Sequence, residues 1–328
     1  MDNLIDLKAY PVSSVLGILL QDKTTKENII FATDSYQEKG DNYSATSQMT
    51  IEAIAGIDPF DLQPRVAKDR TAQAARTKTR AEIFTPSWLC NRMNNDIDEA
   101  WFGRRNIFNN EKEKTWDVNA ERIVFPEDKT WRDYVMSRRL EICCGEAPFL
   151  VSRYDTTTGD IIFPLEQRIG ILDRKLRVVN DNTAVEEEWF EWVYRAFQST
   201  YGYEFQGDSL LIGRINLLNT FVDYLENRWK REATSIELRK AANIIAWNIW
   251  QMDGLTGTIP FRTKIEHEQI SLFEQGDVPG EQIGMFTQVE LKQMEPKKMI
   301  GCRIYDWVAN RSQPYESLKG VGYSYEKV

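Results

Sequence analysis

Histidine is almost absent from this chain of 328 residues, which contains only His267 and four cysteines. The cysteines are Cys90, Cys143, Cys144 and Cys302, and they do not form the spaced pairs that bind zinc. A single histidine also argues against a Ser-His-Asp or Cys-His catalytic arrangement. We therefore expect no metal site, and we interpret Cys143 and Cys144 as thiols of an apolar core.

Long apolar runs are also missing. No run approaches the roughly 20 residues that span a bilayer, and the start MDNLIDLKAY does not resemble a signal peptide. The longest apolar stretches, VSSVLGILL and ANIIAWNIW, have the length of one helix or strand. We expect a cytoplasmic protein that has no membrane partner.

Positive charge is scarce overall, because 41 Lys and Arg stand against 50 Asp and Glu and the formal net charge is −9. This balance argues against a protein that coats nucleic acid by bulk attraction. One stretch nevertheless concentrates basic residues, namely Arg65, Lys68, Arg70, Arg76, Lys78 and Arg80. Such a cluster can bind DNA phosphates, and a solvated helix face explains it equally well.

The hydrophobic pattern divides the chain into three parts. Two β-branched runs, VSSVLGILLQD and IIFATD, flank the polar KTTKEN and predict a β-hairpin within a β-rich segment of residues 1–64. Residues 65–258 alternate strand and helix patterns, which is typical of an α/β domain. Residues 259–328 form a loop-rich tail in which CRIYDWVA is the best strand candidate.

The α/β part has recognisable helix signals. Thr85 and Pro86 predict a helix start, with Thr85 as the cap. Three apolar residues follow at helical spacing, namely Leu89, Met93 and Ile97. A later helix is expected after the capping box of Thr234 and Glu237.

Three predicted strands of this part end in a glycine turn or an acid. RRLEICCGEAPFL runs from a strand into a turn, while YGYEF and NIWQMDGL each contain an acid at or near the strand end. In doubly wound folds a nucleotide-type cofactor lies across the carboxyl ends of such strands. An α/β domain without a cofactor remains an open alternative.

Four segments resemble a known family when they are taken in order. IFTPSWLCNRM resembles the FTP segment of adenine-specific DNA methyltransferases, and LEICCGEAPFL resembles their glycine motif. YGYEF and NIWQMDGL resemble the next two strand motifs of that family, and the whole is most similar to short proteins labelled restriction endonuclease subunit M. The resemblance implies a Rossmann-like methyltransferase fold, S-adenosylmethionine as cofactor and DNA as substrate.

The resemblance also assigns residues to the cofactor. It implies contacts from Phe84, Thr85, Pro86, Glu141, Gly145, Ala147, Phe149, Glu204 and Asp253. In the family, the acid matching Glu204 contacts the ribose hydroxyls and the acid matching Asp253 contacts the adenine amine. Ala147 replaces the second glycine of the motif, and we expect its Cβ to narrow the approach of the cofactor.

The base-flipping motif of the family is missing. It consists of Asp, Asn or Ser, then Pro-Pro, then Tyr or Phe, and it holds the extruded adenine. The nearest string here is Ser312-Gln313-Pro314-Tyr315, in which Ser312, Pro314 and Tyr315 are weak catalytic candidates. A surface turn is the alternative, so enzymatic activity remains open and we expect the isolated chain not to methylate DNA.

The chain also ends before the later strands of this fold, so the fold is expected to be incomplete. An exposed central strand edge invites pairing, so either CRIYDWVA closes the sheet or a second chain or self-association covers it. In the tail, Gln269, Leu272 and Phe273 belong to QISLF, which resembles the peptide that binds the bacterial sliding clamp. Alternatively, the Leu-Phe pair packs on its own domain.

Two functions therefore follow from the sequence. The first is a DNA methyltransferase-like modification subunit that binds S-adenosylmethionine and needs a partner for adenine methylation. The second is a non-catalytic methyltransferase-like scaffold that binds DNA, the sliding clamp or both. Methylation of a substrate other than DNA has no specific support in the sequence.

Overall fold

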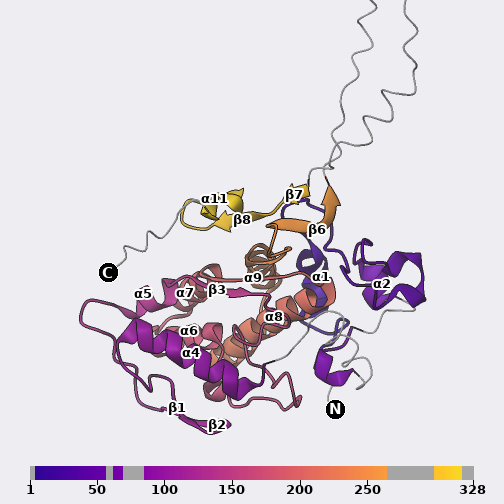
Figure 1. Ribbon diagram of the computed structural model, residues 1–328. Coiled ribbons are helices and arrows are strands. Elements are labelled where there is room, and N and C mark those ends of the chain that lie inside the picture. Colours follow the sequence, from indigo (N-terminus) through magenta and orange to yellow (C-terminus); the bar gives the residue numbers. More distant parts are fainter. Residues whose placement is uncertain (1–3, 57–61, 69–84, 264–298, 320–328) are drawn as a thin grey trace, which may run out of the picture.

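The computed structural model describes residues 4–56, 62–68, 85–263 and 299–319 (Figure 1). The helices are α1 Val12–Leu20, α2 Ile51–Ala55, α4 Ser87–Phe102, α5 Trp131–Met136, α6 Ile171–Asn182, α7 Glu186–Gln198, α8 Gly207–Trp229, α9 Ser235–Asn248 and α11 Glu316–Lys319. Short 3₁₀ turns are η1 Gln37–Lys39, η2 Asp41–Tyr43, η3 Arg65–Ala67 and η4 Leu165–Gln167. Among these residues, no helix has the length and apolar character needed to cross a bilayer.

The strands form one parallel sheet and three antiparallel pairs. They are β1 Asn109–Lys112, β2 Thr115–Val118, β3 Arg139–Ile142, β4 Thr200–Glu204, β5 Ile249–Gln251, β6 Thr258–Thr263, β7 Met299–Gly301, β8 Arg303–Asp306 and β9 Arg311–Pro314. The antiparallel pairs are β1-β2, β6-β7 and β8-β9. The parallel sheet has the order β3-β4-β5, and its connections contain α6 and α7, then α8 and α9. The predicted α/β class is therefore confirmed.

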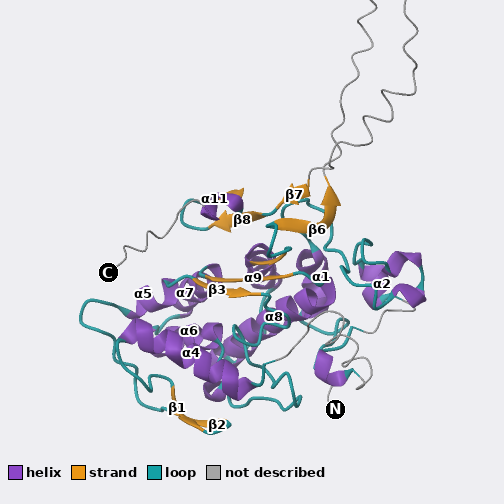
Figure 2. Cartoon of the chain, viewed as in Figure 1, coloured by secondary structure: helices purple, strands orange, loops and turns teal. Residues whose placement is uncertain are grey.

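The two faces of the parallel sheet are covered differently. The main core lies among the helices and includes Ile249 of β5. On the other face, Tyr203 and Trp250 pack with Ile259 and Ile304 in a smaller cluster. Figure 2 shows the short strands β6, β7 and β8 on the side of the sheet opposite α4, α6 and α8. The predicted strand in CRIYDWVA exists as β8, but it pairs with β9 and does not join the parallel sheet.

The predicted N-terminal hairpin is wrong, because VSSVLGILL forms helix α1. Its buried residues recur at helical spacing, namely Val12, Val15, Leu16, Leu19 and Leu20. This spacing lets one face pack against α8 and α9, and that burial outweighs the β propensity of the valines. The expected turn does occur, since Gln21 and Asn28 form an antiparallel bridge around it.

A buried arginine fastens this N-terminal helix to the rest of the chain. Arg214 of α8 is fully buried, and its guanidinium donates to the carbonyls of Leu19 and Gln21 near the end of α1. The same group donates to Ala246 O and Ile249 O at the end of α9. One side chain thus binds the free carbonyls at the ends of two helices.

Helix α4 forms where it was predicted, but it buries a polar stripe. Met93 and Ile97 are 47% and 40% exposed, whereas Asn91, Asn94 and Asp98 are buried. The predicted cap is also wrong, because Thr85 makes no cap and Ser87 N instead donates to Asp155 Oδ2 at 2.8 Å. The capping box of Thr234 and Glu237 at α9 is confirmed.

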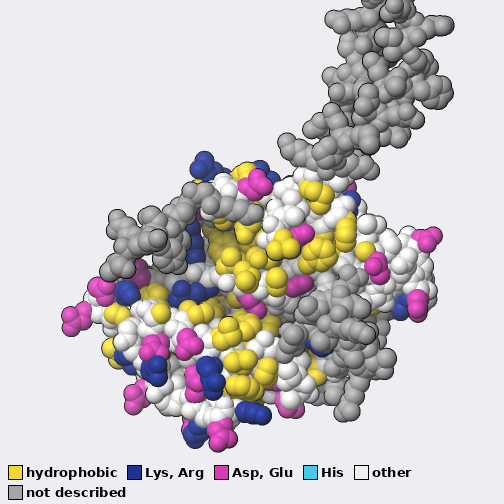
Figure 3. Space-filling view, in the orientation of Figure 1, with side chains coloured by type: hydrophobic (Ala, Val, Ile, Leu, Met, Phe, Trp, Pro, Cys, Tyr) yellow, Lys and Arg dark blue, Asp and Glu magenta, His cyan; other side chains and the backbone are white. Residues whose placement is uncertain are grey.

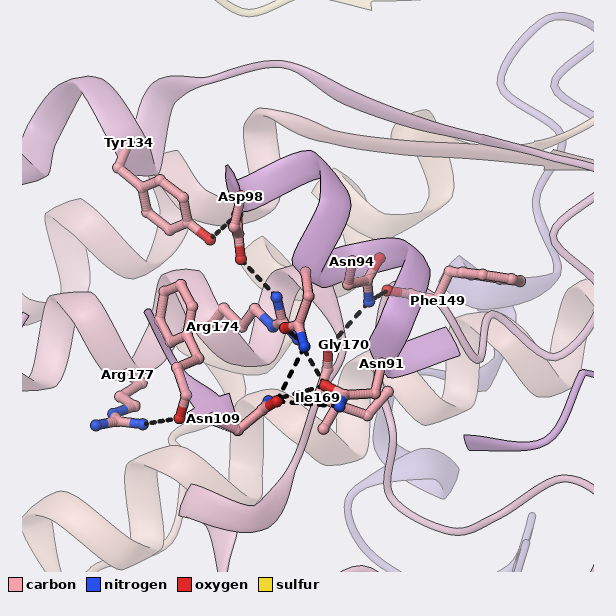
Figure 4. A network of polar contacts seen from close by, with 12 residues as sticks. Asn91, Asn94, Asp98, Asn109, Tyr134, Phe149, Ile169, Gly170, Arg174 and Arg177 are labelled. Carbon is pink, nitrogen blue, oxygen red and sulfur yellow. Dashed lines mark hydrogen bonds and ion pairs between the residues drawn. The ribbon is translucent and has the colours of Figure 1, made fainter. Parts of the chain in front are cut away.

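The polar stripe of α4 binds Arg174 of α6 and Tyr134 of α5. Arg174 Nη1 donates to Asp98 Oδ2 at 2.6 Å, and Tyr134 Oη donates to Asp98 Oδ1 at 2.9 Å (Figure 4). Arg174 Nη2 also donates to Asn91 Oδ1 at 2.8 Å. Because the ion pair is buried and its groups are hydrogen-bonded, each partner compensates the desolvation of the other.

Candidate functional site

The carboxyl ends of the three parallel strands bring the predicted turn and acids together. The turn at Gly145 follows β3, Glu204 ends β4, and Asp253 comes two residues after β5. The Cys143 thiol lies in the same turn and is exposed, so the expectation of a core thiol is wrong for Cys143, whereas Cys144 is buried. Partial desolvation, and then the negative charges of Glu204 and Asp253, raise the pKa of Cys143. These side chains therefore share one edge of the sheet, where α/β proteins bind ligands.

The turn after β3 has an unusual backbone. Cys143, Gly145 and Ala147 all have left-handed conformations, with φ of 52°, 53° and 65°. A residue with a Cβ adopts this region at a cost of roughly 1–2 kcal/mol, so Ala147 takes a conformation that favours glycine. Ala147 is fully buried, and a Cβ built on Gly213 of α8 would lie 3.5 Å from its own Cβ. Its methyl group therefore faces α8.

Glu204 holds this turn through its carboxylate. Oε2 accepts from Gly145 N at 2.9 Å, and Oε1 accepts from Phe205 N and Gln206 N at 2.9 and 3.0 Å. Burial raises the pKa of Glu204, while these hydrogen bonds act in the opposite direction. A carboxylate offers about four acceptor positions, so one further donor, such as a hydroxyl group, can still bind.

Glu141 lies beneath the same turn. Burial, and then the charge of Glu204, raise its pKa well above the ordinary value, while the backbone N–H groups of Phe149 and Leu150 act to lower it. Its Oε2 is buried and has no hydrogen-bond partner among the described residues. The residue thus supports the segment that ends at Phe149 and Leu150.

Asp253 caps the turn that follows β5. Its Oδ1 accepts from Leu255 N at 2.9 Å and from Thr256 N at 3.3 Å, and its own N–H donates to Thr258 O at 2.8 Å. These side-chain bonds involve only one carboxylate oxygen. Asp253 is half-buried, so its position is compatible with a ligand at the sheet edge.

The start of α4 lies against the segment that follows the glycine turn. Thr85 O accepts from Thr156 Oγ1 at 3.1 Å, and Pro86 is the residue before the helix. Asn94 Nδ2 donates to Phe149 O at 3.0 Å and to Ile169 O at 2.9 Å. Thr85, Pro86 and Phe149 therefore belong to one assembly, while Phe84 lies outside the described residues.

Two residues of the basic cluster are engaged with acids near the turn. Arg65 N donates to Glu146 Oε1 at 2.7 Å, and Lys68 Nζ lies 3.4 Å from Asp208 Oδ2. Asp208 is fully buried in the first turn of α8 and also accepts from Tyr36 Oη. The other cluster residues, Arg70, Arg76, Lys78 and Arg80, lie outside the described residues, as do Gln269, Leu272 and Phe273 of the clamp-like peptide.

The degenerate catalytic string lies on the β8–β9 hairpin. Ser312 and Pro314 belong to β9, and Arg303 Nη2 donates to Ser312 Oγ at 3.0 Å. Tyr315 is half-buried, with its ring centroid 6.1 Å from that of Trp250. The string therefore follows a hairpin strand rather than a strand of the parallel sheet.

Two large cavities lie away from these residues. One of about 670 Å³ is lined by charged residues that include Arg122, Arg177, Asp181 and Arg228. Another of about 610 Å³ lies along residues 42–53. Neither is lined by a residue that the sequence assigns to the cofactor. Among the described residues, no three His, Cys, Asp or Glu side chains cluster as metal ligands.

The sequence did not single out several residues that build this site. Asn94, Asp155 and Gly213 fix the turn to α4 and α8, and their roles depend on partners far along the chain. Asp208 alone carried a local signal, as an acid in the first turn of the helix after YGYEF.

Comparisons with protein-family models, with curated proteins and with solved structures find no match for this chain. The four motifs and the geometry of the strand ends therefore carry the functional argument.

Proposed function

We propose that this chain is the S-adenosylmethionine-binding part of a DNA methyltransferase-like protein, and that adenine methylation requires a partner. In this proposal β3, β4 and β5 form the first half of a Rossmann-like methyltransferase sheet. One observation carries it. Gly145, Glu204 and Asp253, assigned by three separate motifs, follow three adjacent parallel strands and gather at their carboxyl ends.

The chemistry of the edge suits a nucleoside with a charged tail. Carboxylates of Glu204 and Asp253 can accept from hydroxyl and amine groups, and the left-handed turn lets the backbone approach the ligand closely. Pro86 and Thr85 at the start of α4 are held close to the turn through Asn94. This supports their proposed contact with the methionine end of the cofactor.

Calorimetry with S-adenosylmethionine tests this assignment. A hydrogen bond to a charged group contributes roughly 1.5–3 kcal/mol, so Asp253→Ala is expected to weaken binding about tenfold or more. Asp306→Ala is the matched control, because Asp306 Oδ1 accepts from Val308 N and Ala309 N in an equivalent turn. Equal affinity in both variants and in the natural chain contradicts the role of Asp253.

A second candidate is a non-catalytic methyltransferase-like scaffold for DNA or the sliding clamp. The position of Ser312 and Tyr315 beyond the parallel sheet favours it, because the family's base-binding residues follow a sheet strand. Incubation of the purified chain with mixed-sequence DNA and labelled S-adenosylmethionine is expected to transfer no methyl group. If the natural chain transfers methyl groups to DNA and the Tyr315→Ala variant does not, residues 312–315 form a catalytic site and the non-catalytic scaffold is excluded.

A further inference from the structure

On one face of the parallel sheet, other residues of the chain cover β4 and β5 but not the edge strand β3. Ile142, Tyr203 and Trp250 lie in one row across β3, β4 and β5, and their exposed fractions are 65%, 7% and 5%. Leu140, on the same face of β3, is 51% exposed. Figure 3 shows hydrophobic side chains gathered in the hollow below the β8–β9 hairpin, with Lys and Arg side chains beside them. Residues of β6 and β8 thus cover β4 and β5 and leave the β3 side chains open.

The backbone of β3 is open at the same edge. Arg139 N donates to Ser199 O at 3.0 Å, and in a parallel ladder alternate residues bond to the same neighbour. Arg139 and Glu141 therefore bond to β4, while the N–H and C=O groups of Leu140 and Ile142 point away from it. Within the described part of the chain, no strand pairs with that side of β3.

This edge carries only some of the features that keep strands apart, because β3 is short and contains Arg139 and Glu141 on the face opposite Leu140 and Ile142. Natural proteins protect exposed edges with proline, lysine, bulges or inward charges. The strand Arg139–Ile142 has neither proline nor lysine, and its open face carries leucine and isoleucine. Beside it lies a cavity of about 180 Å³ lined by Arg138, Leu140, Tyr201, Trp250, Tyr305 and Tyr315, among others. An added strand would therefore find both free backbone groups and an apolar recess.

We propose that β3 pairs antiparallel with β3 of a second copy of this chain, around a two-fold axis at Leu140. A two-fold interface requires a surface that is complementary to itself, and the sequence of β3 meets this condition. With Leu140 opposite Leu140, Arg139 lies opposite Glu141 of the second copy. Arg139 Nη2 and Glu141 Oε2 are both buried and have no hydrogen-bond partner among the described residues, and an arginine beside a buried carboxyl group favours its ionised form. The two three-stranded sheets become one continuous sheet.

Charge also selects this register over its neighbour. If the axis lay at Glu141, the two Glu141 carboxyl groups would lie directly opposite each other and neither would gain a cationic partner. In the register centred on Leu140, Ile142 lies opposite Arg138 of the second copy, and Arg138 lines the cavity beside the strand. The aliphatic stem of Arg138 can cover Ile142 while its guanidinium stays in water.

Light scattering after gel filtration tests the interface. A single chain has a mass of 38.2 kDa, and we expect the natural chain to have twice that mass at micromolar concentration. Leu140→Lys places two like charges on the axis and is expected to weaken the dimer at least tenfold. Phe163→Lys is the matched control, because Phe163 is an exposed apolar residue away from β3, and it is expected to leave the dimer intact.

The outcomes separate clearly. A natural chain that stays monomeric, or a Leu140→Lys chain that keeps the full dimer, overturns the proposal. Circular dichroism of each variant checks that a variant measured as a monomer is still folded. Because the contact does not require a cofactor, loss of the dimer and loss of S-adenosylmethionine binding are independent results.

Cross-linking tests the register itself. Cys143 is exposed, so the variants are made with Cys143→Ser. Leu140→Cys places two thiols on the axis with Cα atoms about 5.5 Å apart, within the range for a disulfide. Ile142→Cys places them four residues out of register, roughly 13 Å along the strands. Copper-phenanthroline oxidation is expected to link only the first pair, and linkage of the second pair alone overturns the register.

Discussion

The helices of the main core are held together in two different ways. Apart from the hydrogen bonds of Arg214 at the end of α9, helices α8 and α9 bury apolar side chains, among them Leu211, Leu218, Leu238 and Ile245. Helices α4 and α6 instead meet through hydrogen bonds and an ion pair that centres on Arg174. Apolar contact has little directional preference, whereas hydrogen bonds weaken steeply outside a narrow geometry.

We call α4 and α6 the polar half of the core, and α8 and α9 the apolar half. The difference between them matters because the polar half adjoins the candidate site. Asn94 binds Phe149 O directly after the glycine turn, and Asp155 binds the first N–H of α4. Directional bonds fix the position of Thr85 and Pro86 relative to Gly145 more narrowly than apolar packing does. The polar half is therefore the part of the molecule in which small changes should alter both stability and ligand binding.

The largest effect is expected from breaking the ion pair of the polar half. Asp98→Ala leaves the guanidinium of Arg174 buried without its carboxylate, which costs about 3–5 kcal/mol of the free energy of unfolding. Urea denaturation measures this loss. In the double variant with Arg174→Met, the unpaired charge is gone and part of the stability should return.

Shape-preserving substitutions sharpen the same comparison. Leu218→Met in the apolar half keeps the volume and should cost less than about 1.5 kcal/mol. Asp98→Asn also keeps the shape but removes the charge that faces Arg174, so most of the loss seen in Asp98→Ala should remain. Equal tolerance of both substitutions would show that the halves are not held differently.

The next effect concerns pH. Asp173 of α6 is fully buried, and burial raises its pKa to about 6, against the opposing effect of Arg168. The ordinary value is about 3.9, so between pH 4 and 6 the folded chain holds a proton that the unfolded chain has released. Raising the pH through this range should therefore lower the free energy of unfolding, by a total on the order of 3 kcal/mol.

The control for this prediction is Asp173→Asn, which accepts a hydrogen bond from Ser152 N without titrating. The free energy of unfolding of the natural chain and of the variant is measured by denaturation at pH 4, 5, 6 and 7. The difference between the two free energies should change as the pH rises to about 6 and should level off above that pH. A difference that is independent of pH would show that Asp173 is ionised throughout.

A smaller effect is expected at the junction with the glycine turn. Asn94→Ala removes the side-chain hydrogen bonds to the carbonyls of Phe149 and Ile169, and only Phe149 O keeps a second donor, Ile171 N. We expect a cost of about 1–3 kcal/mol in the free energy of unfolding. Calorimetry should also show weaker S-adenosylmethionine binding, because the turn loses its support. The control is Asn182→Ala, since Asn182 donates to Val178 O within α6, accepts only a long, exposed bond of 3.5 Å from Arg122 Nη2, and neither bond reaches the turn.

Local patterns predicted the strands and their acids but not the contacts that position them. The run ending at Ile142 and the acids Glu204 and Asp253 are visible in short windows of sequence, and all lie where the strand pattern placed them. The Cβ of Ala147 was expected to narrow the approach of a cofactor, but it lies on the side of Gly213 of α8. The carboxylate of Glu204 was expected to face a ligand, yet it also binds three N–H groups of its own chain.

Two elements differ from the prediction for the same physical reason: residues 12–20 form a helix instead of a strand, and α4 buries a different face from the one expected. In residues 12–20, β-branched residues suggested a strand, but the helical spacing of Val12, Leu16 and Leu19 was the decisive signal because α8 and α9 offer a surface for it. In α4, the apolar stripe was visible, but Arg174 lies 76 residues from Asp98. A short stretch of sequence around α4 does not contain Arg174, the partner that compensates the burial of Asp98.

The smallest expected effect tests the outer face of α4, where the helical pattern and the structure differ. Met93 and Ile97 are nearly half exposed, so Met93→Ala and Ile97→Ala should each change the free energy of unfolding by no more than about 0.5 kcal/mol. If this face were part of a core, each substitution would cost about 2–5 kcal/mol. Urea denaturation of both variants, beside Leu218→Ala as a buried reference, distinguishes the two cases. A loss above 2 kcal/mol would mean that another part of the chain or a second copy covers α4, and the contrast between the two halves would then no longer hold.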